Sequence, residues 1–285
     1  MTGLTPVRIG FAFNPTNEAA VELRDRAVGW AAMRGLTYWT STAADLEAMH
    51  RELPGTDVLV VLGGDGTFLR AARAVADLDV PLLGINVGKI GFLSRVEAGD
   101  LVRVLDQLRA GAYTLEHRMA LEARILRDGA EVDPSERHVA LNDVVVARGS
   151  LARVVRLDIS IDDSHLATFV ADGLVVASPT GSTGYSFSAG GPILDPTARN
   201  LIVTPIAGYL TTIRSVVVGP SGVVRCCVTD AHEALVSIDG REDVPIAVGD
   251  VVEVRALHQS IRFVQPEGSL PFWDLLRQKV ELLPS

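Results

Sequence analysis

The chain has 285 residues and a formal net charge of −9, and 48% of its residues are hydrophobic. At about 150 residues per domain, this length predicts two domains. The acidic balance disfavours nucleic acid, which needs a basic surface, and anionic lipid. The two cysteines, Cys226 and Cys227, are adjacent. This excludes a disulfide framework and a Cys-rich zinc site.

The N-terminal sequence lacks the pattern of a signal peptide, in which a charged segment precedes a long apolar run. No window approaches the ~20 apolar residues of a membrane span. We therefore expect a soluble, cytoplasmic protein with no membrane contact. The six histidines are scattered without ligand spacing on one helix, so no metal site is predicted from a direct protein motif.

Between residues 7 and 113, short apolar runs alternate with stretches of helical periodicity. This alternation predicts βαβ units with a parallel sheet, a Rossmann-like α/β domain. The expected strands and helices are, in chain order, strand 7–13, helix 18–34, strand 57–62, helix 68–76, strand 81–85 and helix 101–110.

After residue 114 the pattern changes to short β-type runs separated by turn sequences such as Asp128-Gly129 and Asp239-Gly240. Such spacing is typical of a mostly antiparallel sandwich or barrel. The expected strands are 120–126, 139–147, 153–161, 166–170, 174–177, 216–218, 223–229, 235–238, 251–256 and 260–264.

Residues 272–283 return to helical spacing, and the apolar face of this helix needs a partner element. We expect an α/β domain over 1–113, completed by a returning helix in 268–285. A β-rich, sandwich-like domain is expected over 114–267.

Gly63-Gly64-Asp65-Gly66-Thr67 follows a predicted buried strand and opens a predicted helix. Glycines permit close approach of a ligand, and the N–H groups at a helix start favour an anion such as phosphate. Asp65 would repel a bare phosphate, so it either holds Mg²⁺ or accepts a proton from an attacking hydroxyl. A turn in which Asp65 only caps the helix is the structural alternative.

A second glycine-rich segment, residues 84–93, follows a predicted parallel strand, where ligands commonly bind. It could equally be a simple connection, and Phe92 could stack on a base or belong to the core. Asn142-Asp143 could hold sugar hydroxyls or form an ordinary turn. Gly, Ser and Thr supply ten of the fourteen residues of Ser178–Gly191, which suits a polyhydroxylated, phosphorylated ligand. A linker would have a similar composition, but would not normally carry Tyr185 and Phe187.

Taken in order, these segments resemble the NAD kinase family, over most of the chain from Val7 onward. The Gly-Gly-Asp-Gly-Thr motif is shared with diacylglycerol and sphingosine kinases. The combination of Asn142-Asp143, Asp172-Gly173 and the run Thr180–Pro192 is far more specific to NAD kinases.

The resemblance implies phosphorylation of the 2′-hydroxyl of the adenosine ribose of NAD, which gives NADP. ATP or polyphosphate would be the donor, with Mg²⁺ accompanying it, in a homodimer or homotetramer. By this resemblance Asp65 is the general base. The residues that the resemblance places at the dinucleotide are Gly64, Gly66, Arg70, Phe92, Asn142, Asp143, Arg153, Asp172, Thr183, Gly184, Tyr185, Ser188 and Arg241.

The chain departs from the family pattern at three places. Val87 stands where Arg is common, and Val170 stands where bacterial members often carry a basic residue. Ala207-Gly208-Tyr209 follows Thr204-Pro205-Ile206, where a Pro-His pair is common. These losses leave the reaction class intact but open the choice of phosphoryl donor and the choice between NAD and NADH.

Two other functions compete with this one. A lipid kinase of the diacylglycerol type shares the glycine-rich Asp loop, but should carry a basic or apolar membrane-facing patch. A regulatory homologue would bind NAD without transferring phosphate, and the three departures are its only support.

Overall fold

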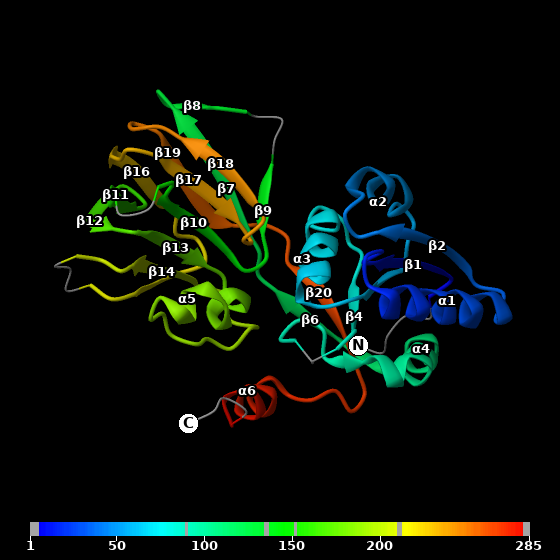
Figure 1. The fold of residues 1–285 in the computed structure, drawn as a ribbon. Coiled ribbons are helices and arrows are strands. Elements are labelled where there is room, and N and C mark those ends of the chain that lie inside the picture. Colours follow the sequence, from blue (N-terminus) through cyan, green and yellow to red (C-terminus); the bar gives the residue numbers. More distant parts are fainter. Residues whose placement is uncertain (1–5, 89–90, 134–136, 151–152, 210–212, 282–285) are drawn as a thin grey trace. The chain divides into compact units, whose positions relative to one another are not determined.

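The computed structural model describes residues 6–88, 91–133, 137–150, 153–209 and 213–281. The chain forms two compact units (Figure 1). Unit 1 comprises residues 1–117 and 261–285, and unit 2 comprises residues 118–260.

Unit 1 is built on a sheet in which neighbouring strands β2–β1–β3–β4–β20 run parallel. Its strands, in spatial order, are β2 (Thr37–Thr42), β1 (Arg8–Phe13), β3 (Val58–Leu62), β4 (Leu82–Asn86), β20 (Ile261–Pro266) and β6 (Tyr113–Arg118), with β5 (Val96–Glu97) beside β4. Its helices are α1 (Glu18–Met33), α2 (Leu46–Glu52), α3 (Asp65–Ala74), the short 3-10 turn η1 (Ala98–Asp100), α4 (Leu101–Ala110) and α6 (Phe272–Glu281).

The helices of unit 1 cover its sheet, as Figure 1 shows with α1 and α4 together and α2 and α3 together. Successive side chains of a strand point to opposite faces. On β1, Ile9 and Phe11 therefore share one core with Trp30 of α1 and Leu105 of α4. On the other face of β1, Gly10 leaves room for the ring of Trp39, which a Cβ atom at this position would overlap.

Unit 2 contains two sheets, and the strand pairs formed by its described residues are antiparallel. One sheet has the order β15 (Val216–Val218), β14 (Leu201–Ile206), β13 (Gly173–Ala177), β10 (Asp143–Arg148), β17 (Ala234–Ile238) and β18 (Glu242–Ile246). The other has the order β12 (Ser164–Ala171), β11 (Val155–Ile161), β16 (Val224–Asp230), β19 (Val251–Ala256), β7 (Leu121–Arg127) and β8 (Ala130–Glu131), with β9 (His138–Ala140) beside β7. Two short turns, η2 (Thr180–Thr183) and α5 (Tyr185–Ser188), follow β13.

One large apolar core is shared by the two sheets of unit 2. Val144 and Val176 come from one sheet, and Leu157 and Phe169 come from the other. Cys226 lies in the same core, where burial raises the pKa of its thiol, while Cys227 is half-buried. The predicted antiparallel sandwich is confirmed, as is the parallel sheet of the N-terminal region.

The structure corrects the strand predictions at two places. The run 139–147 was predicted as one strand but is two, β9 and β10, which pair in different sheets. The run 260–264 was predicted within the antiparallel series, but β20 pairs in parallel with β4 in unit 1. The predicted elements do not include β2, α2, β6, β14 and β18. Their apolar positions are few, or are interrupted by polar residues and by Pro205 or Pro245.

The predicted C-terminal helix is confirmed as α6, which belongs to unit 1. Phe272 at its start contacts Phe92, with the ring centroids 6.2 Å apart. Within the described residues, no helix combines the length and the hydropathy that crossing a bilayer requires.

Candidate active site

Asp65 is the first residue of α3, directly after the buried strand β3 and two glycines. The N-cap of the helix is Gly64, which has no side chain to make a capping bond. The alternative in which Asp65 merely caps the helix is therefore not what the structure shows. The strand-to-helix turn instead directs the Asp65 side chain toward a neighbouring loop.

The carboxylate of Asp65 accepts backbone N–H bonds from the second half of the glycine-rich segment 84–93. Phe92 N–H donates to Oδ2 at 3.0 Å, and Leu93 N–H donates to Oδ1 at 3.2 Å. The N–H of Ser94 is a longer third donor, at 3.4 Å from Oδ1. A carboxylate offers about four acceptor positions, so roughly one remains for another partner.

Gly91 makes this contact possible. A Cβ atom on Gly91 would overlap the carboxylate of Asp65, so only glycine allows the loop backbone to approach so closely. The predicted residue Phe92 lies next to it, with its ring against Phe272 and Lys279 of α6. Phe92 therefore packs within unit 1. The predicted residues Gly66 and Arg70 are exposed on the first two turns of α3.

In unit 2, the predicted residues Asn142 and Asp143 form a corner between β9 and β10. The N–H of Ser178 donates to the carbonyl of Asn142 at 2.8 Å, and the Ser178 hydroxyl donates to the carbonyl of Leu141. A Cβ atom on Gly181 would overlap the backbone of Asn142. We call residues 141–143 the Asn-Asp corner. The Ser/Thr/Gly-rich segment is therefore an ordered partner of this corner rather than a linker.

Thr183 and Gly184 lie beside the corner. A Cβ atom on Gly184 would be 3.7 Å from Asp143 Oδ2. The Thr183 hydroxyl donates to the carbonyl of Thr180 at 3.4 Å. Tyr185 and Ser188, on the following turn α5, are exposed.

Asp239, which the sequence predicts only as part of an Asp-Gly turn, also contacts the Asn-Asp corner. Its carboxylate accepts N–H bonds from all three residues of the Asn-Asp corner. The predicted residue Arg241 follows on the same turn, and its charge interacts with Asp239. The pattern Asp-Gly gave no hint of this contact, because it is equally typical of a hairpin turn.

Two carboxyl groups lie close together here: Asp143 in the Asn-Asp corner, which is buried, and its partner Asp239, which is half-buried. Burial raises the pKa of Asp143 to about 7, and the neighbouring carboxylate of Asp239 adds to the rise. Burial also raises the pKa of Asp239, while the three N–H bonds and Arg241 oppose that rise. Perturbed carboxyl groups of this kind are typical of functional sites.

Asp172 lies at the opposite end of β10 from the Asn-Asp corner. Its carboxylate forms an ion pair with Arg148 at 2.7 Å, and Arg148 is the last residue of β10. Asp143 and Arg148 are five residues apart, which is roughly 17 Å along a strand. Arg153 is exposed just before β11, whose Val155 is paired with Ala171 next to Asp172. The structure therefore places Asp172 and Arg153 away from Asn142 and Asp143.

Two of the departures from the family pattern, Val170 and the segment 207–209, lie close to Asp172. The N–H of Tyr209 donates to the carbonyl of Val170 at 2.7 Å, and the Tyr209 side chain is 69% exposed. Val87, the third departure, instead lies at the end of β4 against the core of unit 1.

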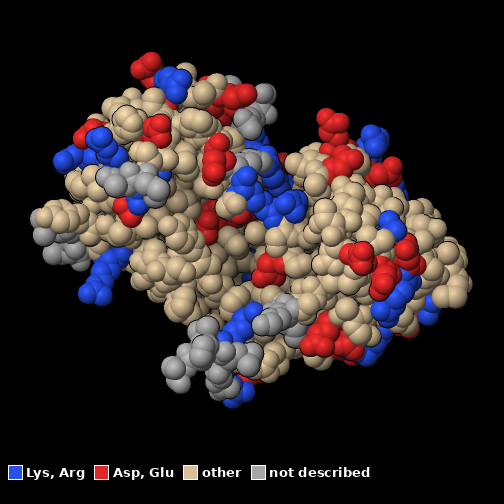
Figure 2. Space-filling model, in the orientation of Figure 1, with Lys and Arg blue, Asp and Glu red and all other residues tan. Residues whose placement is uncertain are grey.

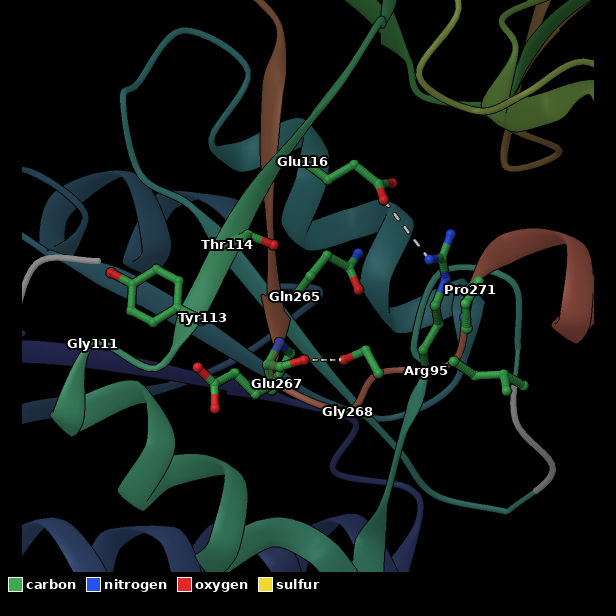
Figure 3. A pocket seen from close by; sticks show the side chains of 12 residues that line it. Arg95, Gly111, Tyr113, Thr114, Glu116, Gln265, Glu267, Gly268 and Pro271 are labelled. Carbon is green, nitrogen blue, oxygen red and sulfur yellow. Dashed lines mark hydrogen bonds and ion pairs between the residues drawn. The ribbon is translucent and has the colours of Figure 1, made fainter. Parts of the chain in front are cut away.

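Unit 1 also contains a pocket of about 610 Å³ that includes none of the predicted site residues (Figure 3). Arg95, Tyr113, Glu116 and Gln265 line it, together with the segment 266–271. The guanidinium of Arg95 points toward the Glu116 carboxylate at 3.8 Å, and the Ser269 hydroxyl donates to the carbonyl of Pro266 at 2.7 Å. The pocket lining mixes polar and apolar residues and carries both signs of charge.

Charged side chains of both signs are interspersed over the face that Figure 2 shows. On the outer side of unit 2, Glu122 pairs with Arg255 and Arg137, while Arg127 pairs with Asp250. Among the described residues, no three His, Cys, Asp or Glu side chains are grouped to hold a metal ion.

Comparison with protein families matches both parts of the chain. Residues 37–113 match the ATP-NAD kinase N-terminal domain, and residues 141–266 match the ATP-NAD kinase C-terminal domain. The NAD kinase of Heliobacterium modesticaldum is 39% identical over 281 residues, covering 96% of this chain and 98% of that protein. The NAD kinase of Symbiobacterium thermophilum is 45% identical over 225 residues, covering 79% of this chain and 78% of that protein.

Solved structures share the fold. The yeast NADH kinase complexed with NADH aligns with a TM-score of 0.83 at 22% identity, covering 98% of this chain and 89% of that one. The NAD kinase from Archaeoglobus fulgidus in complex with ATP aligns with a TM-score of 0.77 at 22% identity, covering 97% and 100% of the two chains.

Proposed function

Because the chain belongs to the NAD kinase family, we propose that it transfers a phosphoryl group from ATP to the 2′-hydroxyl of the adenosine ribose of NAD, giving NADP. The observation that carries this proposal is the presence of both family domains together with a carboxylate, Asp65, oriented by loop amides. The family matches also set aside the lipid kinase of the diacylglycerol type.

Asp65 is proposed as the general base. A secondary hydroxyl is a weak nucleophile, so a carboxylate within hydrogen-bond reach has to take its proton during phosphoryl transfer. The loop amides hold the Asp65 carboxylate in one orientation and leave roughly one acceptor position for that hydroxyl. Gly64, Gly66 and Arg70 are proposed to lie beside the dinucleotide.

The Asn-Asp corner of unit 2 is proposed to hold ribose hydroxyls of NAD. With a pKa of about 7, Asp143 exists at neutral pH in both the protonated and the ionised form. The protonated carboxyl can donate to a sugar oxygen, and the carboxylate can accept from a sugar hydroxyl. Thr183, Gly184, Tyr185, Ser188 and Arg241 are proposed to complete this part of the NAD site.

Asp172 and Arg153 are proposed to bind a different part of the substrate. The roughly 17 Å along β10 between Asp143 and Arg148 is too far for one ribose to contact both strand ends. An extended dinucleotide, with two riboses and two bases, has several groups to offer. Phe92 is proposed to lie near the substrate while it packs on α6.

Mg²⁺ is proposed to bind together with the phosphates of the donor. Mg²⁺ is usually held by one or two carboxylates together with substrate phosphates. When bound, it would neutralise charge that develops on the transferred phosphoryl group. We further propose a symmetric homodimer or homotetramer in the cytoplasm.

A coupled assay tests the proposed function. Purified protein, Mg²⁺ and NAD are mixed with ATP or with polyphosphate, and NADP is measured with an NADP-specific dehydrogenase. NADH is tested as acceptor in parallel. NADP formation with ATP is the expected result. NAD binding by calorimetry without product from either donor would favour the regulatory homologue instead.

Asp65→Asn is expected to lower turnover by at least about a hundredfold, because general-base catalysis contributes 10²–10⁴-fold. The asparagine amide would also face N–H donors of the loop, so the variant could disturb the loop itself. Gly91→Ala is therefore a second test. Its methyl group would displace the carboxylate of Asp65, while the Asp65 side chain itself stays unchanged. Both variants should lose turnover.

Asp25→Asn serves as the control, because it replaces an exposed acid on α1. Its turnover should equal that of the wild type. An Asp65→Asn enzyme that turns over at the normal rate would remove Asp65 from the mechanism, even if the wild type proves to be an NAD kinase.

A further inference from the structure

We infer that Asp239 is a positioning residue of the NAD site: its carboxylate holds the backbone of Leu141, Asn142 and Asp143 and thereby orients the side chains of the Asn-Asp corner. This inference rests on the proposed function, because it takes NAD as the ligand of the corner. Asp239 acts in it through Asn142 and Asp143 and does not itself touch the substrate.

The contact between Asp239 and the corner consists of four hydrogen bonds. Leu141 N–H donates to Oδ2 at 2.9 Å, and Asn142 and Asp143 N–H donate to Oδ1 at 2.7 and 3.2 Å. In return, the N–H of Asp239 donates to the carbonyl of Asp143 at 3.0 Å. Three successive amides that converge on one carboxylate fix the path of the chain at the point where β9 ends and β10 begins.

The backbone at Asp239 is suited to this task. Asp239 and Gly240 have φ angles of +50° and +65°, and the N–H of Arg241 donates to the carbonyl of Ile238 at 3.1 Å. These are the features of a type I′ hairpin turn, which favours Asp, Asn or Gly at its first central position. Antiparallel pairing of Val144 with Ile238 places this turn across from the corner.

The opposite side of the corner is held by the Ser/Thr/Gly-rich segment. The amide and hydroxyl of Ser178 bond the carbonyls of Asn142 and Leu141. At Leu141 and Asn142, both backbone N–H groups therefore donate to Asp239, and both carbonyl groups accept from Ser178. The side chains of Asn142 and Asp143 are the groups that remain to meet a ligand.

The negative charge of Asp239 also raises the pKa of the Asp143 carboxyl group. The charged groups around Asp143 are Asp239 and, behind it, Arg241 on the same turn. On the side of η2, the guanidinium of Arg118 donates to the Thr180 hydroxyl at 3.3 Å. Removing the charge at position 239 should therefore lower the pKa of Asp143 toward its ordinary range.

Two substitutions separate geometry from charge. Asp239→Gly removes the carboxylate but keeps a residue that adopts positive φ readily. Asp239→Asn keeps the turn and one acceptor oxygen and removes the charge. Asp128→Gly is the matched control, because Asp128 has φ +51°, precedes Gly129 at φ +80° and is exposed on another hairpin of unit 2.

The full-length variants are assayed with NAD and ATP, and thermal unfolding is recorded for each. Asp239→Gly should raise KM for NAD about tenfold to a hundredfold, because small misplacements of binding groups have effects of that size. KM for ATP should change less than about twofold over the same variants. Asp239→Asn should recover part of the loss and should move the Asp143 limb of the kcat/KM profile to lower pH. Asp128→Gly should match the wild type.

Equal changes in KM for both substrates would overturn the positioning role. An unmoved pH limb in Asp239→Asn would overturn the effect of the Asp239 charge on Asp143. If Asp239→Gly unfolds, Asp239→Asn carries the test, because it retains the turn. If the wild type makes no NADP, the proposed function fails. In that case calorimetric titration of NAD into the wild type and Asp239→Asn still decides whether position 239 supports NAD binding.

Discussion

The carboxyl group of Asp143 is buried at the start of β10, and its pKa is raised to about 7. In the unfolded chain an aspartate titrates near pH 3.9. Between these two values the folded protein binds more protons than the unfolded chain. The contribution of Asp143 to stability is therefore fully present below about pH 4 and is lost as the pH rises through about 7.

The Asp143→Asn variant lacks this titration. The free energy of unfolding of the wild type should therefore fall relative to that of the variant between pH 4 and pH 7.5, by at least about 1 kcal/mol. Urea unfolding of both proteins at several pH values measures the difference. A difference that stays constant with pH would show that Asp143 titrates as it does in the unfolded chain.

At the scale of an element, α1 shows how an amphipathic helix is positioned and where it can be improved. Asn17 caps its N-terminus by accepting the N–H of Ala20, and Leu23, Ala27 and Trp30 face the core. Gly29 lies inside the helix, where glycine costs conformational entropy. A Cβ atom at Gly29 would meet nothing within 4 Å.

Gly29→Ala is expected to stabilise the protein by about 0.5–1 kcal/mol, because alanine is the better helix former and no atom obstructs it. Differential scanning calorimetry should show a higher transition temperature. Gly10→Ala is the contrasting variant, since its methyl group would overlap the ring of Trp39, and it should lower the transition temperature. A lower transition temperature for Gly29→Ala would contradict the argument.

At the scale of the whole molecule, the two units differ in how the chain builds them. Unit 2 is one continuous segment, residues 118–260, with its own core. Unit 1 needs two segments, because β20 from the C-terminal part lies between β4 and β6 in its sheet. A fragment that ends before residue 261 lacks an interior strand of that sheet.

We therefore expect the fragment 118–260 to fold alone and the fragment 1–117 to remain unfolded. Dispersed amide NMR signals and a cooperative thermal transition would identify the folded fragment. Adding the segment 261–285 back to the first fragment should restore structure. Cooperative unfolding of 1–117 by itself would show that β20 is dispensable.

The sequence by itself determined the fold class, the reaction family and most elements, because these depend on local periodicity and short motifs. Alternation of apolar runs and helices predicted the parallel sheet, and regularly spaced β runs predicted the sandwich. The Gly-Gly-Asp-Gly-Thr motif placed Asp65 correctly at the start of α3, directly after β3. The site roles of the individual residues remain predictions.

Only the tertiary structure decided which segments meet. The break between β9 and β10, the placement of β20 beside β4 and the three amides on Asp239 all join residues far apart in the chain. Local sequence carries no signal for such contacts, because an Asp-Gly turn looks the same whether its carboxylate faces water, as at Asp128, or a backbone corner, as at Asp239. The separation of Asp172 from Asn142 by the length of β10 likewise follows from strand pairing alone.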